Sequence, residues 1–270
     1  MRQRLLRWGA YLLVAGAFAV VCALLSQWQF DRNEQTTKQI ALVERNYDAP
    51  PVPLDDLIGP DGRLPDAAEW HPVELRGQYL SDQQLLARNR PHGGTSAFEV
   101  LVPFQDRSGH VLLVDRGWVP PAEDSSPGVV PAPPSGEVTV IVRLRPGEQL
   151  PASGRGAPEG QVPTINLPTI AELMNPGLVT GAYGQLASED PAPAKHLGGF
   201  DSPTEDPGPH LSYAIQWIIF AVMGFAFIGY IIRTEIVKAE EDAGERPRRA
   251  KRRRDHDADD EDALLDAVAR

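Results

Sequence analysis

The sequence predicts two transmembrane α-helices in a hairpin topology that enclose one exported, mainly antiparallel β domain, either a small barrel or a sandwich. Two observations predict the helices: an uncharged stretch of 23 residues over 8–30 and another of 22 residues over 211–232. A third predicts the domain. Between the two stretches, short β-type segments alternate with Gly- and Pro-rich turns, a pattern typical of small antiparallel folds.

Each uncharged stretch is long enough to cross a bilayer, because about 20 residues at 1.5 Å per residue span a core of roughly 30 Å. Trp8 and Trp28 lie near the ends of the first stretch, where indole rings favour the membrane–water interface. A cleaved signal peptide is the alternative, since a basic leader precedes this stretch. The stretch is long for a signal, and no small-residue cleavage site follows Ala23. We therefore expect a retained helix over residues 8–30.

Basic residues beside the two stretches indicate the orientation of the chain. The leader, residues 1–7, carries three Arg and no acid, and residues 233–270 carry ten Lys or Arg. Basic flanks stay on the cytoplasmic side, so we expect both termini in the cytoplasm and the large loop on the outer face of a bacterial plasma membrane. The tail, 233–270, places a basic block before an acidic one and is predicted to be disordered.

The exported loop, residues 31–209, is acidic and β-rich. Its 13 basic and 25 acidic residues give a net charge of −12, which argues against nucleic acid as a partner. Its length suffices for one domain with a hydrophobic core. Proline-rich insertions interrupt it at 120–136 and 190–209. The predicted strands are Val73–Tyr79, Leu85–Asn89, Phe98–Phe104, Val111–Arg116, Val138–Leu144 and Ala182–Leu186, and the predicted helix is Pro168–Met174.

The loop lacks a recognisable catalytic set, so we expect neither enzyme activity nor a metal site. Gly93–Gly94 indicates a turn after His92, with an exposed binding loop as the alternative. Cys22 is the only cysteine, which excludes an intramolecular disulfide, and we expect it to be a small packing residue. The loop histidines, none at metal-ligand spacing from another, are His71, His92, His110 and His196.

The segment Val114–Pro120 is more specific. Arg116 lies at the end of a predicted strand, Gly117 permits a sharp change of direction, and Trp118 offers a large flat surface. One interpretation is a strand end at which Arg116 and Trp118 stack to close the barrel. The other is a docking surface, because exposed Arg and Trp are frequent at binding hot spots. The sequence leaves both interpretations open.

The second span begins with a polar and aromatic face. We expect the first span to offer a matching groove of small residues at four-residue spacing, made of Ala15, Ala19 and Ala23. A neutral imidazole of His210 can ligate haem iron, with Tyr213 and Trp217 covering the porphyrin. The alternative, favoured by the residues alone, is a polar cap that binds no ligand. The predicted face of the second span consists of His210, Tyr213, Ala214, Trp217, Ala221 and Gly224.

Over about residues 10–235, the chain resembles the surfeit-locus-one family, membrane proteins that assist assembly of cytochrome c oxidase. Asp115 departs from the family pattern, which commonly has Asn before the Arg-Gly-Trp. The resemblance rests on four blocks in the family's order, Trp28–Arg32, Val73–Tyr79, Leu112–Pro120 and His210–Trp217.

The resemblance implies an assembly factor for an a-type cytochrome c oxidase, which inserts haem a transiently or stabilises subunit I. It implies that His210 is a haem contact, with Tyr213 and Trp217 as its neighbours. We assign contacts with the oxidase subunits to two residues of the first block, Trp28 and Arg32, and to two of the third, Arg116 and Trp118.

Two other functions remain open. The first is a stable accessory subunit of the oxidase or of a respiratory supercomplex, which holds subunits together without binding haem. The second, an exported hydrolase, requires a catalytic set that the sequence does not offer.

Overall fold

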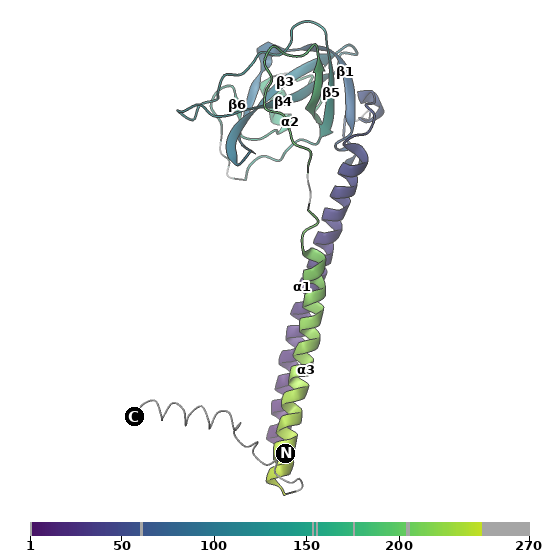
Figure 1. The fold of residues 1–270 in the computed structure, drawn as a ribbon, viewed down its shortest axis with the longest axis vertical. Coiled ribbons are helices and arrows are strands. Elements are labelled where there is room, and N and C mark those ends of the chain that lie inside the picture. Colours follow the sequence, from purple (N-terminus) through teal and green to yellow (C-terminus); the bar gives the residue numbers. More distant parts are fainter. Residues whose placement is uncertain are drawn as a thin grey trace, which may run out of the picture. The chain divides into compact units, whose positions relative to one another are not determined.

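The computed structural model of the chain describes residues 2–244 apart from residues 60, 61, 153, 155, 175, 204 and 205. The chain forms two units, each compact in itself. A helical unit contains the chain up to Asn33 and from Gly208 onward, and a β domain extends from Glu34 to Pro207 (Figure 1). The helical unit therefore joins the two ends of the sequence, as the predicted hairpin requires.

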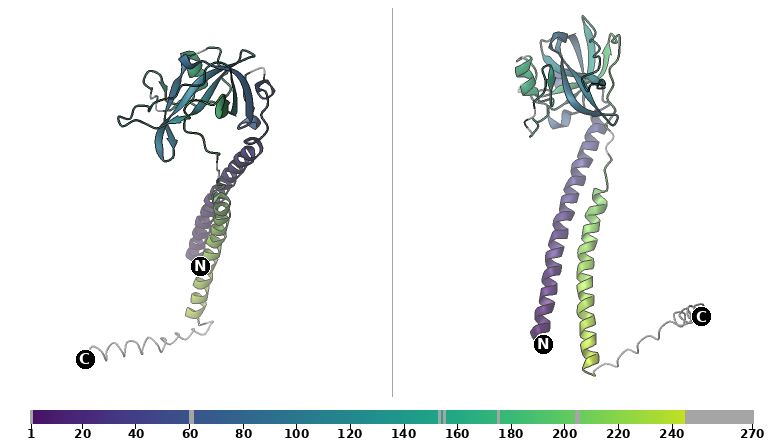
Figure 2. Two further views of the ribbon diagram at one scale, coloured as in Figure 1. Left: turned by 45° about the horizontal axis from the view of Figure 1, so that its top comes forward. Right: turned by 90° about the vertical axis from the view of Figure 1, so that its left-hand side faces the viewer.

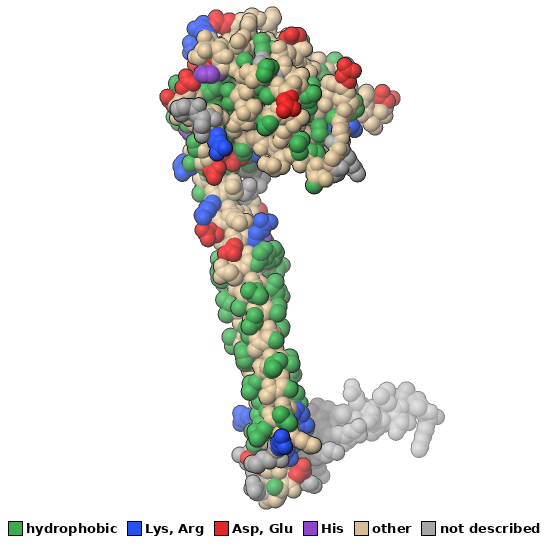
Figure 3. All heavy atoms as spheres, turned by 180° about the vertical axis from the view of Figure 1, so that it is seen from behind, with side chains coloured by type: hydrophobic (Ala, Val, Ile, Leu, Met, Phe, Trp, Pro, Cys, Tyr) green, Lys and Arg blue, Asp and Glu red, His purple; other side chains and the backbone are tan. Residues whose placement is uncertain are grey.

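Two long helices exceed the predicted spans: α1 covers Arg2–Asn46 and α3 covers His210–Asp242. Both are long and apolar enough to cross a membrane. Hydrophobic side chains cover the middle of the helical unit, and charged side chains gather toward its ends (Figure 3). Figure 2 shows the two helices side by side.

The helices extend past the predicted boundaries because charged residues end a membrane span without ending a helix. Residues 31–46, predicted as part of the exported β domain, contain no Gly or Pro and continue α1. Residues 233–242, predicted to be disordered, continue α3 up to the turn at Gly244, where φ is +78°. The remainder of the predicted tail, residues 245–270, lies outside the described residues.

The β domain contains one seven-stranded sheet with the order β1-β5-β7-β4-β3-β2-β6. Every predicted strand exists, and the predicted hairpin of Phe98–Phe104 with Val111–Arg116 is the antiparallel pair β3/β4. The predicted helix is α2, Leu167–Leu173, whose N-cap Asn166 accepts a hydrogen bond from the Thr169 N–H. The strands are β1 Pro72–Tyr79, β2 Leu85–His92, β3 Thr95–Asp106, β4 Val111–Val119, β5 Val138–Arg145, β6 Gln161–Val162 and β7 Tyr183–Asp190.

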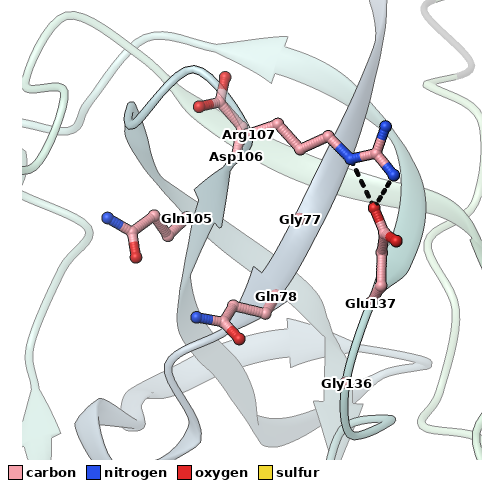
Figure 4. A pocket seen from close by; sticks show the side chains of 7 residues that line it. All are labelled: Gly77, Gln78, Gln105, Asp106, Arg107, Gly136 and Glu137. Atoms are coloured by element: carbon pink, nitrogen blue, oxygen red, sulfur yellow. Dashed lines mark hydrogen bonds and ion pairs between the residues drawn. The ribbon is translucent and has the colours of Figure 1, made fainter.

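The sheet closes into a small barrel. Strand β1 pairs with β5 along its length and with the C-terminal end of β3, so β1, β5, β7, β4 and β3 form a ring. Gly77 lies at this closure, where a Cβ would meet the Gln105 carbonyl oxygen at 1.9 Å. Only glycine allows the two backbones to approach this closely. Gly77 and Gln105 also line a shallow pocket that contains an exposed ion pair of Arg107 with Glu137 (Figure 4).

Most strand pairs among the described residues are antiparallel, as predicted, but the sheet is mixed and not purely antiparallel. Strand β7 runs parallel to β4, and β6 runs parallel to β2. Parallel neighbours need a long crossover, and the chain from 120 to 182 provides one that includes β5, β6 and α2. The sequences of the strands themselves do not indicate such a crossover, so the parallel pairing could not be predicted from them.

Two hydrophobic cores lie on opposite faces of β3 and β4. The barrel interior contains every second residue of β5, namely Val138, Val140, Val142 and Leu144. The second core packs α2 and Ile165 against the other face, where Leu101 and Leu113 point. Because both faces of β3 and β4 are covered, charged residues on these strands become buried.

Candidate functional site

The two helices of the helical unit contact each other through faces that repeat every three or four residues. Several residues of α3 outside the predicted face are half-buried, among them Phe220 and Ile228. On the predicted face, Ala214 is buried, and His210, Trp217, Ala221 and Gly224 are half-buried. Tyr213, predicted with them, is 46% exposed. This alternating spacing is typical of paired helices, in which hydrophobic positions recur every 3.5 residues.

The facing surface of α1 differs from the predicted groove. Ala15 is buried and Ala19 is half-buried, but Ala23 is exposed. Residues that follow one another every four positions rotate gradually away from the partner helix, because contacts between paired helices recur every 3.5 residues. After Ala19, the buried residues on this side of α1 are therefore Cys22 and Ser26. Cys22 is fully buried, which confirms its predicted packing role.

Polar contacts join the helices at the end where α3 begins. His210 Nδ1 lies 2.9 Å from Gln29 Oε1, and both side chains are half-buried. One turn further along, the Ser26 hydroxyl donates to the Ala214 carbonyl at 2.9 Å, and both residues are buried. His210 Nε2 has no protein partner among the described residues. The structure thus leaves His210 with one nitrogen engaged and one available to a ligand.

The remaining residues predicted for haem contact are placed differently. Trp217 is half-buried on the face of His210 and packs edge-on against Phe220, with ring centroids 5.7 Å apart. Tyr213 lies beside this face and is exposed. Therefore His210 and Trp217 share one side of α3, and Tyr213 does not join them in the helix–helix contact.

The opposite end of the helix pair is held by one carboxylate. Glu235 Oε2 accepts hydrogen bonds from Trp8 Nε1 at 2.8 Å and from the Arg7 guanidinium at 3.0 Å. Both donors belong to α1 and the acceptor to α3. Polar contacts at both ends of the pair therefore fix how far one helix is shifted along the other.

Two predicted partner residues, Trp28 and Arg32, lie on the surface of the helical unit. Trp28 is 55% exposed, and Arg32 is exposed one turn further along α1. Exposed indole and guanidinium groups suit a contact with another protein or with a membrane interface. The structure leaves both side chains accessible to a partner.

Arg116, predicted to bind a partner, lies inside the β domain instead. Its side chain is 1% exposed and forms an ion pair with Glu189 at 3.0 Å. The Tyr79 hydroxyl donates to the same carboxylate at 2.8 Å, and the guanidinium lies 5.1 Å from the centre of the Tyr79 ring. This cluster joins β1, β4 and β7 across the barrel. Arg116 therefore has the alternative role of closing the barrel.

Trp118 is half-buried beneath a segment that precedes α3. Its backbone exchanges two hydrogen bonds with Gly198, and its Nε1 donates to the Gly199 carbonyl at 2.8 Å. A Cβ on Gly198 would lie 2.3 Å from the indole, so glycine is required there. The indole also stacks on the His92 ring at a centroid distance of 5.1 Å. Little of this side chain remains for a partner.

A charged cluster around the buried Glu99 was not predicted from the sequence. Arg90 of β2 forms an ion pair with Glu99 of β3 at 2.5 Å and a two-point contact with Glu148 at 2.7 and 3.1 Å. His92 lies 2.9 Å from Glu99, so it belongs to this cluster and not to an exposed loop. The Gly93–Gly94 turn that joins β2 to β3 confirms the predicted turn. The cluster holds β2 and β3 against the segment that leads to α2.

Two features explain why the sequence analysis did not predict this charged cluster. A bulge between Ala87 and Arg90 shifts the register of β2, and Asn89 within it has φ of +59°. The shift changes the faces on which Arg90 and His92 lie, which alternation alone cannot foresee. The available signal was Glu99, a lone carboxylate inside the apolar run Phe98–Phe104, because such a charge needs partners when its strand is covered on both faces.

The cluster changes the acidity of its members. Burial tends to raise the pKa of Glu148, but hydrogen bonds from Arg90, Thr164 and the Ile165 N–H outweigh it and lower that pKa. Asp115, on β4, is buried and accepts a hydrogen bond from the Gly117 N–H at 3.3 Å. Burial, and then the charge of Glu99, raise the pKa of Asp115 well above its usual value. The part of the chain that the structure describes contains no group of three or more residues placed to hold a metal.

Comparisons with known proteins agree on one family. The family model described as SURF1 family matches residues 16–222. Two proteins named uncharacterized SURF1-like proteins, from Mycobacterium tuberculosis and Mycobacterium bovis, are each 40% identical over 248 residues, which is 89% of this chain and 89% of theirs. A SURF1-like protein of Monosiga brevicollis is 26% identical over 236 residues, 79% of this chain and 84% of its own. The family match extends from within α1, through the β domain, into the first part of α3.

The helix contact can be tested at Gly224. A Cβ there would lie 3.1 Å from the Phe18 ring, so Gly224→Leu should separate α1 from α3 and cost about 1–3 kcal/mol through overpacking. The measurement is thermal unfolding of the purified protein in detergent. Gly229→Leu is the control, because a Cβ at Gly229 meets nothing within 4 Å. Equal melting temperatures for the two variants would contradict this contact.

Asp115 gives a pH-dependent test. Since its pKa is raised in the folded state, its stabilising contribution is complete below about pH 4 and is lost as the pH rises through the folded-state pKa. Asp115→Asn keeps the acceptor for Gly117 and removes the charge. It should stabilise the protein at pH 7.5 by about 1 kcal/mol or more, with a smaller gain at pH 5.

Denaturant unfolding at both pH values measures this effect. Glu123→Gln, at an exposed position, should change neither value. A loss of stability in Asp115→Asn at pH 7.5 would show that the ionised carboxylate is required where it lies.

Proposed function

Because the chain belongs to the SURF1 family, we propose that it assists the assembly of an a-type cytochrome c oxidase, inserting haem a or stabilising subunit I. Members of this family are known generally as cytochrome oxidase assembly factors. The observation that carries the proposal is the family match over residues 16–222, which includes His210 and its partner Gln29. The proposed role requires no reaction catalysed by the chain itself.

The surroundings of His210 fit a haem ligand. Its Nδ1 is engaged by Gln29 and its Nε2 has no protein partner in the described residues, which is the arrangement that an iron-binding imidazole needs. Trp217 lies two turns along the same face and offers an aromatic surface to a porphyrin. When bound, haem a would supply an iron that accepts an imidazole nitrogen as a ligand. His210 would bind it, and Trp217 would cover part of one side.

Contacts with the oxidase are proposed for the exposed residues of the first block. Trp28 and Arg32 are accessible on the helical unit, so they are retained as candidate contacts with oxidase subunits, especially subunit I, or with lipid. Arg116 is not retained, because its guanidinium is committed to Glu189 inside the barrel. The half-buried Trp118 is proposed only as a support for the segment that precedes α3.

The alternative, a stable accessory subunit of the oxidase or of a supercomplex, has one observation in its favour. An apolar groove of about 530 Å³ lies between α2 and the segment 156–164. Leu150 and Leu173 at the groove are 58% and 64% exposed. Permanent interfaces are more apolar than transient ones, so this surface suits a lasting contact.

A deletion strain tests the proposal. Loss of the gene should lower oxidase activity and haem a absorbance and leave other respiratory complexes unchanged. Native protein should restore both, whereas His210→Ala should restore them only in part, because an iron bond is lost while Trp217 and the oxidase remain. His196→Ala, an exposed histidine in the β domain, is the control.

Two outcomes of this experiment would contradict the haem role. An unchanged haem a spectrum and activity in the deletion strain would exclude any function in oxidase assembly. Full restoration by His210→Ala, together with stoichiometric co-purification of the chain with mature oxidase, would favour the accessory subunit.

We also propose that both termini lie in the cytoplasm and the β domain lies outside a bacterial plasma membrane. The basic leader and the ten basic residues after Ile232 support this orientation. A loop as long as residues 31–209 is translocated largely regardless of its own charge, so the short basic flanks decide the orientation.

Reporter fusions test the orientation. A reporter that is active only outside the membrane should be active when inserted at Ser125, an exposed turn residue, and silent when fused after Arg270. A cytoplasmic reporter at the same two positions should give the opposite result. An active outside reporter after Arg270 would exclude the proposed hairpin.

A further inference from the structure

We infer that Gln29 is a positioning residue that sets the tautomer of His210 and thereby leaves Nε2 as the nitrogen available to iron. This inference rests on the proposed haem role of His210. The observation behind it is the 2.9 Å contact between His210 Nδ1 and Gln29 Oε1, which joins α3 to α1. Gln29 lies 181 positions away in sequence, so its relation to His210 exists only in the folded helix pair.

The chemistry of the contact determines where the imidazole proton lies. A neutral imidazole carries one N–H, and its other nitrogen holds a lone pair. In the structure the amide oxygen of Gln29, which can only accept, faces Nδ1, and with this orientation a neutral ring carries its proton on Nδ1. The lone pair is then on Nε2, which has no protein partner in the described residues. Metal-binding histidines commonly donate a hydrogen bond from the N–H of their second ring nitrogen to a nearby acceptor in this way.

A neighbouring hydrogen bond holds the two helices together close to Gln29. Ser26, one turn before Gln29, is buried and donates to the carbonyl of Ala214, one turn after His210. This second bond fixes the rotation and the shift of the two helices at this level. Gln29 also adds no charge, so it orients the ring without the cost of burying a carboxylate.

Gln27 provides a matched control on the same helix. It is exposed, and its amide nitrogen donates to Asp31 on its own helix at 2.8 Å. Gln27 and Gln29 are two positions apart and point to different sides of α1. The same substitution at both positions therefore separates the contact with His210 from a general effect of removing an amide.

The tautomer can be measured without haem. The full-length protein, labelled with 15N-histidine and purified in detergent, gives ring-nitrogen NMR signals, and the His210 signals are those absent from His210→Ala. We expect the Nδ1–H tautomer in the native protein and in Gln29→Glu, which keeps an acceptor oxygen. Gln29→Met, similar in size but without an acceptor, should shift the population toward Nε2–H. Gln27→Met should match the native protein.

These spectra also separate positioning from loss of structure. Far-ultraviolet circular dichroism should be the same in Gln29→Met and Gln27→Met, which would show that both variants keep their helices. A native Nε2–H tautomer, or an Nδ1–H tautomer that persists in Gln29→Met, would overturn the inference.

Binding of ferric protohaem to the same variants connects the tautomer to ligation. Gln29→Met should weaken binding by about 10- to 100-fold, as loss of a hydrogen-bond partner behind a metal ligand usually does. Gln29→Glu should retain binding. Equal affinities for the native protein and Gln29→Met would overturn the positioning role.

The two measurements distinguish failure of the inference from failure of the proposed function. If the native protein binds no haem but shows an Nδ1–H tautomer that depends on Gln29, the haem role fails while the effect of Gln29 on the imidazole stands. If haem binds through His210 but the tautomer of His210 does not depend on Gln29, only the positioning role of Gln29 fails.

Discussion

The contact between α1 and α3 is the constraint on which the proposed site depends. Its apolar middle allows some sliding of one helix along the other, whereas its polar ends do not. Glu235 accepts from Arg7 and Trp8 at one end, and Gln29 meets His210 at the other. In apolar surroundings an unpaired polar group is costly, so these pairs select one register. That register brings a histidine and an amide from opposite ends of the sequence within hydrogen-bonding distance.

Much of the fold could be predicted because the deciding signals are local. Alternation gave the strands of the barrel, and the uncharged stretches gave the cores of both helices. The sequence did not reveal that β7 runs beside β4 in parallel, since this depends on a crossover of about sixty residues. Nor did it reveal the length of α1, because residues 31–46 are polar yet well suited to a helix.

The candidate site was predicted in part. His210 and Trp217 lie on one face because helical spacing is reliable within a long helix, whereas Tyr213, one position from that face, is exposed. Arg116 was assigned to a surface because its burial depends on Glu189, a residue 73 positions away. Arg90 and His92 were missed because a bulge turns their strand. In each case the failure came from a contact or a register distant from the residue itself.

The burial of Cys22 has a consequence for how the helix pair can be observed. It is the only thiol in the chain, and it lies fully buried between the helices. Cys22 lies within the uncharged stretch 8–30, so a membrane-permeable maleimide can reach its sulfur only when α1 and α3 move apart. Cys22 is therefore a native chemical probe for separation of the two helices. The rate at which Cys22 is alkylated measures, without any substitution, how often α1 and α3 separate.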